Sequence, residues 1–153
     1  MALLVGIDPG NTTGIAFGAY PADDKPYDPE FTYQAGVEQY FEFLKALSTE
    51  EMPITVVCES FTLQRGRPMS SDQISPTYLI GALQYLAYVN RDITLVMQTP
   101  AAAKEGVKDK HLEKLGLLQT PKTKWNHAND AMRHVVQYLK SIGHMPTLEG
   151  GFK

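Results

Sequence analysis

The sequence predicts a mixed α/β fold in which helices pack on a sheet that begins with a hairpin. Two patterns indicate this class. Short apolar runs between turn residues dominate the first sixty residues, and helical periodicity then alternates with further short apolar runs. The chain has 153 residues, of which 43% are hydrophobic and 20% charged. This is the composition of one globular domain with its own core, spanning residues 1–153.

Five short apolar runs are predicted to form the strands. Leu3–Ile7 precedes a Pro-Gly turn and is predicted as a central strand, with Gly14–Gly18 as its hairpin partner. The other predicted strands are Phe31–Val37, Ile54–Cys58 and Ile93–Met97. Three strands followed by strands that alternate with helices are typical of a mixed sheet between helical layers.

Helical spacing of apolar residues predicts four helical segments. They are Glu38–Leu47, Thr77–Val89, the basic segment Ala101–Leu118 with a break near Gly106, and Asn126–Ile142 followed by Gly143. Ser75 and Pro76 are predicted to open the second segment, because proline is favoured at the first helical position. That segment is apolar on nearly every side, which predicts burial on two faces, one against the sheet and one against a second copy of the chain.

Composition and charge indicate the cellular compartment and the kind of binding partner to expect. No apolar run approaches the ~20 residues of a membrane span, and no secretory signal is expected at the start. The single cysteine, Cys58, fits a reducing compartment, so we expect a cytoplasmic protein, either bacterial or viral within its host cell. Residues 1–60 carry two basic and ten acidic residues, whereas residues 61–153 carry twelve basic and seven acidic ones. Such asymmetry can mark a polyanion-binding face, although scattered solvated charges explain it equally well.

Acidic residues stand where two predicted strands end. Asp8 follows the first strand at a Pro-Gly turn, and Glu59 follows the fourth. In the stretch WNHANDAMRHVV, His127 and Asp130 are three residues apart and share a helix face, which His134 could extend. The alanines of this stretch are small enough to let the helix approach the sheet closely. We therefore expect the two strand-end acids to converge with His127 and Asp130.

Such a cluster of carboxylates would need cations. Gathered carboxylates repel one another and stay ionised only if positive charge compensates them. Oxygen-rich sites suit Mg²⁺ or Mn²⁺, and an imidazole adds tolerance of Mn²⁺. Two such ions about 3.5–4 Å apart can hold a phosphodiester for hydrolysis.

Each of the four residues also has an ordinary structural explanation. Asp8 could cap its turn, and Glu59 could be an ordinary acidic residue at the end of a strand. His127 could hydrogen-bond to backbone, and Asp130 lies in the first helical turn, where the helix dipole favours acids. All four explanations would have to hold together for the site to be dismissed.

The stretches GIDPGNTTGIA, VVCESF and HANDAMRHVVQYL resemble, in this order, the three motifs of RuvC-type Holliday junction resolvases. That family belongs to the ribonuclease H-like superfamily, and the resemblance covers nearly the whole chain in element order and motif position. Many relatives carry a carboxylate where His127 stands and some carry histidine. The histidine therefore bears on metal preference and leaves the expected fold unchanged.

The resemblance implies a ribonuclease H-like fold with a mixed five-stranded sheet, its first three strands antiparallel, and helices on both faces. It also implies a metal-dependent endonuclease that resolves four-way DNA junctions. The implied catalytic ligands of two Mg²⁺ or Mn²⁺ ions are Asp8, Glu59, His127 and Asp130. A homodimer formed partly by Thr77–Val89 is implied as well, and its twofold symmetry would match that of the junction.

Basic residues beside the motifs are candidate contacts to DNA phosphates, which give affinity without sequence reading. They are Arg65, Arg67, Lys104, Lys108, Lys110 and Lys124. The resemblance matches Lys104 and Lys110 to basic residues near the scissile phosphate of the resolvases. Phe61 could wedge at the branch point, as an aromatic residue does in relatives, or be a core aromatic at a strand end.

Three other functions fit parts of the sequence. A nuclease of the same fold could act on flaps or structured RNA, and a non-catalytic module could bind junctions without cutting them. An actin-like phosphotransferase also begins with an acid after its first strand. That class needs a duplicated domain and a second phosphate-binding loop, for which this chain is too short.

Overall fold

A mixed five-stranded sheet forms the centre of the computed structural model, which describes residues 1–62, 65–66, 68–120 and 126–152. The strands are β1 (Leu3–Asp8), β2 (Thr13–Ala19), β3 (Pro29–Ala35), β4 (Ile54–Glu59) and β5 (Ile93–Gln98). They lie in the order β3-β2-β1-β4-β5. β1, β2 and β3 pair antiparallel, whereas β4 runs parallel to β1 and β5. The predicted sheet is confirmed, although β3 ends before Val37, which opens the first helix.

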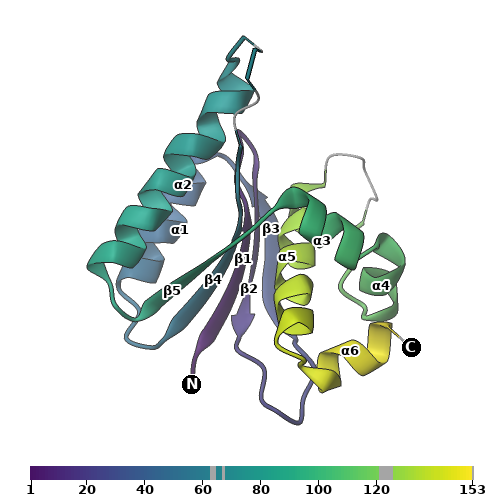
Figure 1. Cartoon of the computed structure of the whole chain (residues 1–153). Helices are drawn as coiled ribbons and strands as arrows, with labels where there is room; N and C mark the ends of the chain where they lie inside the picture. The colour runs from purple at the N-terminus through teal and green to yellow at the C-terminus, as the bar shows by residue number, and fades with distance from the viewer. Residues whose placement is uncertain (63–64, 67, 121–125, 153) are drawn as a thin grey trace.

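Helices cover both faces of this sheet (Figure 1). α1 (Val37–Ser48) and α2 (Ser71–Val89) pack side by side on one face. The helices on the other side are α3 (Pro100–Gly106), α4 (Asp109–Lys114), α5 (His127–Ser141) and α6 (Met145–Gly151). Of these, α5 packs directly on β1 and β2. None of the described helices combines the length and apolar character that crossing a membrane requires.

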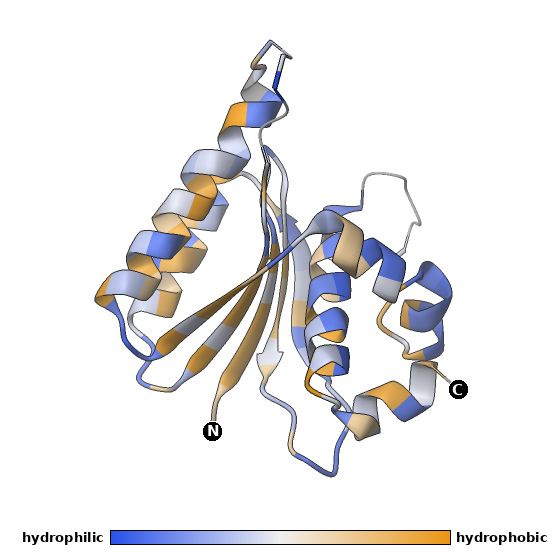
Figure 2. Ribbon diagram, viewed as in Figure 1, coloured by the Kyte–Doolittle hydropathy of each residue, from blue (hydrophilic) through white to orange (hydrophobic). Residues whose placement is uncertain are grey.

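The central strand β1 contributes to a core on each face of the sheet. Leu3, Val5 and Ile7 pack in the core beneath α1 and α2, while Leu4 packs in the core beneath α5. All six residues of β1 are buried, and Figure 2 shows apolar strands enclosed between the two helical layers. Burial on both faces explains why the sequence of β1 is a continuous apolar run rather than an alternating one.

Helix α2 begins at Ser71, so the prediction that Ser75 and Pro76 open it is wrong. The segment before the proline can itself start a helix, because the Gln73 side chain accepts a hydrogen bond from the Ser70 backbone N–H at 3.2 Å. Proline inside a helix removes one backbone hydrogen bond. In α2 the proline is Pro76, so the lost hydrogen bond lies near the N-terminal end of the helix.

The C-terminal half follows the prediction except for one element. The basic segment after β5 is broken at Gly106 into α3 and α4, as predicted. Gly143, with φ of 71°, follows the end of α5, because this left-handed backbone suits glycine and cannot continue a helix. Helix α6 was not predicted, because one proline and two glycines among its seven residues obscure the helical pattern.

Candidate metal centre

The sheet brings the two strand-end acids to one edge. β1 and β4 are parallel neighbours, with Ile7 paired to Cys58, so Asp8 and Glu59 both follow at the carboxyl ends of their strands. Asp8 is only 6% exposed. A buried carboxylate is costly unless it has partners, which makes the surroundings of Asp8 the natural place to seek a function.

Helix α5 reaches this edge because small residues let it touch the sheet. A Cβ on Gly14 would lie 1.8 Å from the His127 carbonyl oxygen, and one on Gly6 would lie 2.3 Å from the Ala131 carbonyl oxygen. The predicted close approach through Ala128 and Ala131 is present, and both alanines are buried. Gly6 and Gly14, on the sheet side of the same contact, were not predicted to take part in it.

Polar side chains fix the first turn of α5 in place. The Gln34 side chain on β3 accepts a hydrogen bond from the His127 N–H at 3.0 Å, and Asn126 accepts one from the Asn129 N–H at 3.1 Å. Asn129 in turn pairs with both backbone groups of Gln119. These contacts satisfy donors that a helix start leaves unpaired, and they hold His127 at a defined position.

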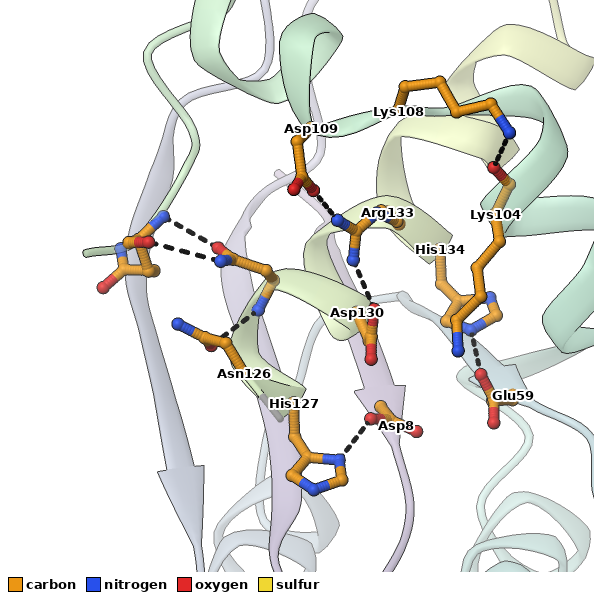
Figure 3. A network of polar contacts seen from close by, with 12 residues as sticks. Asp8, Glu59, Lys104, Lys108, Asp109, Asn126, His127, Asp130, Arg133 and His134 are labelled. Atoms are coloured by element: carbon orange, nitrogen blue, oxygen red, sulfur yellow. Dashed lines mark hydrogen bonds and ion pairs between the residues drawn. The ribbon is translucent and has the colours of Figure 1, made fainter. Parts of the chain in front are cut away.

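Asp8, His127 and Asp130 form a compact group of potential ligands (Figure 3). His127 Nδ1 lies 2.7 Å from Asp8 Oδ2. One ligand atom from each of the three residues lies within 4.8 Å of the others. Ligands of one Mg²⁺ or Mn²⁺ are at most about 4.2 Å apart, so an ion would draw the three side chains slightly closer together. Two carboxylates and an imidazole also match the ligand preferences of Mg²⁺ and Mn²⁺.

Burial, hydrogen bonds and neighbouring charges shift the pKa values of all three residues of this group. Burial raises the pKa of Asp8, opposed by the hydrogen bond from His127, and the Glu59 charge raises it further. The hydrogen bond to Asp8 raises the pKa of His127 despite partial burial. Burial and the Asp8 charge raise the pKa of Asp130, while the Lys104 charge lowers it. Burial and neighbouring carboxylates thus disfavour the charged forms of the two acids, and a divalent cation would offset both effects.

Glu59 lies beside this group but is held by a different partner. Its Oε2 is 3.0 Å from Nε2 of His134, a residue of α5 that is only 1% exposed. Nδ1 of His134 is 2.9 Å from the side-chain amide of Gln98. Glu59 is thus not among the three ligands that meet within 4.8 Å. Its charge still acts on Asp8 and Asp130.

Ion pairs connect Asp130 of the ligand group to the start of α4. Arg133 contacts both Asp130 and Asp109 (Figure 3). Burial lowers the pKa of Arg133, opposed by the Asp8 charge. No role was predicted for Arg133 or Asp109. The spacing of three residues between Asp130 and Arg133 was the available signal for their ion pair.

A basic hollow of about 560 Å³ opens beside Asp130. Its lining residues are Lys104, Val107, Lys108, Asp109, Lys110, Asp130 and Arg133. The three lysines are exposed, and Lys108 Nζ donates to the Lys104 carbonyl at 2.7 Å. The candidate phosphate contacts after β5 therefore gather next to the candidate ligands.

The remaining candidates lie elsewhere in the chain. Arg65 is exposed on the segment after β4. Phe61 is partly buried and packs against the core beneath α1 and α2, which favours its interpretation as a core aromatic. Arg67 and Lys124 lie outside the described residues.

Solved structures of junction resolvases share this architecture. RuvC from Thermus thermophilus, in complex with a Holliday junction substrate, is 17% identical with a TM-score of 0.65, over 93% of this chain and 97% of its own. A second Thermus thermophilus RuvC structure is 16% identical, with the same TM-score and coverage. Fowlpox virus resolvase, in complex with its substrate Holliday junction DNA, is 13% identical with a TM-score of 0.59, over 92% of this chain and 98% of its own.

Sequence comparison adds nothing to this likeness, since no protein-family model and no curated protein sequence matches the chain. The structural likeness nevertheless spans more than nine-tenths of every chain compared. The chain therefore has the ribonuclease H-like fold of the RuvC-type and poxvirus Holliday junction resolvases.

Proposed function

We propose that this protein is a metal-dependent endonuclease that cuts branched DNA, with the four-way junction as its preferred substrate. The observation that carries the proposal is the meeting of Asp8, His127 and Asp130 at the carboxyl edge of the sheet. The three residues come from segments more than a hundred positions apart, on a fold that the junction resolvases share. A capping or dipolar role for each residue separately would not require them to meet.

In this proposal the ligand group and Glu59 hold two Mg²⁺ or Mn²⁺ ions. Bound ions of this kind polarise the phosphodiester and lower the pKa of water, which supplies the hydrolytic chemistry. Asp8, from its rigid strand, fixes the position of the group, and Asp130 and His127 close it from α5. Burial of Asp8 excludes water from the carboxylate and strengthens its interaction with a cation.

The basic hollow would hold the DNA backbone beside this group. Lys104, Lys108 and Lys110 present positive charge next to Asp130, and phosphate contacts of this kind make affinity fall steeply with salt. Arg65, which is exposed on the segment after β4, would add a further phosphate contact. The same role is proposed for Arg67 and Lys124.

Cleavage of a substrate panel tests the proposal. Four-way junction, flap, duplex and structured RNA, each end-labelled, are incubated with the protein in Mn²⁺ and in Mg²⁺. We expect the junction to be cut at least about tenfold faster than duplex. Faster cutting of flaps or RNA would assign the site to another nuclease activity, and junction binding without metal-dependent cutting would indicate a binding module.

Replacing His127 by aspartate is expected to shift metal preference. An imidazole favours Mn²⁺ over Mg²⁺, whereas a third carboxylate suits the harder Mg²⁺. The ratio of cutting rates in Mg²⁺ and Mn²⁺ should therefore rise in His127→Asp, while the variant stays active. Loss of cutting in both ions would show that the imidazole does something other than occupy a ligand position.

Helix α2 carries an exposed apolar stripe on the face that is turned away from the sheet. Its members, with their exposed fractions, are Ile74 (41%), Tyr78 (46%), Tyr85 (68%) and Tyr88 (83%). Gly81 lies in the middle of the stripe, and apart from its chain neighbours and the nearby backbone of α2, no heavy atom of the described residues comes within 4 Å of where its Cβ would stand. Glycine inside a helix costs about 1 kcal/mol relative to alanine, and close approach of a second helix would explain it. We propose this stripe as the homodimer interface.

Gly81→Arg is expected to give a folded monomer. Arginine is a good helix former, so α2 gains stability in the single chain, while its charge lies where the partner helix would pack. Sedimentation velocity should show two-chain particles for the parent and single chains for the variant. Ser141→Arg, an exposed change of equal charge on α5, should leave the parent's particle size. A dimeric Gly81→Arg would place the interface elsewhere.

A further inference from the structure

Three buried or half-buried side chains form a continuous set of hydrogen bonds beside the candidate metal centre. Glu59 and Gln98 end the neighbouring strands β4 and β5 and are paired in register. His134 of α5 lies over both, with Nε2 3.0 Å from Glu59 Oε2 and Nδ1 2.9 Å from the Gln98 amide. His134 follows Asp130 by one helical turn, so the same helix face carries a candidate ligand and this contact.

The amide of Gln98 defines which ring nitrogen of His134 carries the hydrogen. In the orientation that satisfies both ends of the amide, its nitrogen donates to His134 Nδ1 at 2.9 Å and its oxygen accepts from the Tyr138 N–H at 3.3 Å. Since Nδ1 accepts, a neutral ring has its hydrogen on Nε2. That hydrogen is then donated to Glu59. Both nitrogens of a ring that is 1% exposed are thereby satisfied.

Packing of the core alone does not explain why Glu59, His134 and Gln98 are hydrogen-bonded to one another. The neighbouring inward positions of α5 are filled by apolar residues, among them Val135 and Leu139, both fully buried. An apolar residue at position 134 would fill the same space without the cost of burying a polar ring. What the ring adds is a fixed partner for Glu59, whose long side chain would otherwise sample several rotamers.

We propose that His134 is a positioning residue that holds Glu59 so that its other carboxylate oxygen, Oε1, completes a second divalent-ion site beside Asp8, His127 and Asp130. The inference rests on the proposed function, since it presumes that Glu59 is a metal ligand. Outer partners of this type orient ligands, and their loss typically lowers metal affinity about 10- to 100-fold. Gln98 supports the arrangement from β5 by fixing the tautomer of His134.

Mn²⁺ binding to the DNA-free protein, followed by electron paramagnetic resonance and calorimetry, gives a direct test. The parent is expected to bind two ions. In His134→Leu the weaker ion should bind about 10- to 100-fold less tightly, while the tighter one is retained by the Asp8 group. His134→Gln, whose amide nitrogen can replace Nε2 as a donor, should restore the weaker ion to within about threefold of the parent.

Cutting assays separate positioning from general damage. The Mn²⁺ concentration for half-maximal cutting should rise in His134→Leu, with a smaller change in rate at saturating Mn²⁺. In a Glu59→Gln background, His134→Leu should add no further change, because the two residues act through one interaction. Val136→Ala, a core change on the same helix, should lower the melting temperature without altering the Mn²⁺ requirement.

The outcomes distinguish this inference from the proposed function. A parent protein that neither binds Mn²⁺ nor cuts would overturn both. If the parent binds and cuts while folded His134→Leu keeps the parent's Mn²⁺ constants, only the role of His134 is wrong. If His134→Leu does not fold, Gln98→Met provides the test instead, and its Mn²⁺ concentration for half-maximal cutting should rise. An unchanged Mn²⁺ concentration in that variant would overturn the inference. Nitrogen-15 spectra of the metal-free parent should show His134 with its hydrogen on Nε2, and the opposite tautomer would also overturn it.

Discussion

Asp8→Asn is expected to lower junction cutting by about a hundred- to a thousandfold, while junction binding stays within about threefold of the parent. Removing one group that stabilises charge in an active site commonly costs about 10²–10³ in rate, and Asp8 is the member of the ligand group that is most buried. Binding should persist because the lysines of the basic hollow, rather than Asp8, would contact the DNA. Single-turnover cutting and gel-shift titration of the same junction provide the two measurements.

The same substitution is expected to leave the metal-free protein as stable as the parent, or more stable. Burial raises the pKa of Asp8, so its charged form is disfavoured in the fold, and asparagine removes that charge at constant shape. Mn²⁺ should raise the melting temperature of the parent through preferential binding to the folded state, and should do so much less in Asp8→Asn. A variant that cuts at near the parent rate would remove Asp8 from the site.

Gly14→Ala is expected to cost about 3 kcal/mol of unfolding free energy, near the upper end for overpacking a tight contact. The added Cβ would lie 1.8 Å from the His127 carbonyl oxygen, so the N-terminal turn of α5 must move away from β2. Because misplacing a catalytic group by about 1 Å can cost 10²-fold in rate, the folded fraction should also cut poorly. Urea denaturation reports the first effect, and cutting under native conditions reports the second.

Gly36→Ala is the matched control for this change. A Cβ on Gly36 would meet only the Gln39 side-chain oxygen, at 3.8 Å. The substitution should cost no more than about 1 kcal/mol, the usual penalty for alanine at a helix N-cap, and should leave cutting at the parent rate. If Gly14→Ala matched this control in both measurements, the contact between α5 and β2 would be looser than the structure has it.

Local patterns were sufficient to predict where the candidate ligands stand. Asp8 and Glu59 follow short apolar runs, and parallel strands bring their carboxyl ends to one edge. His127 and Asp130 share a helix face by spacing alone. The approach of that helix to the sheet was predicted from its alanines, and the glycines opposite them complete the same contact.

Partners that cross between elements could not be predicted in this way. The contact of His134 with Glu59 depends on the direction in which α5 crosses β4, which no local pattern specifies. The same holds for Arg133, whose link to Asp109 depends on where the start of α4 lies relative to α5. The early start of α2 was missed because the proline signal outweighed the weaker capping signal before it.

The distance along the chain between Asp8 and α5 has a consequence for biosynthesis. β1 and α5 are separated by more than 100 residues, so β1 leaves the ribosome well before His127 and Asp130. A nascent or truncated chain that ends before α5 would hold only the strand-end acids. The proposed metal site could therefore form only after α5 has been synthesised.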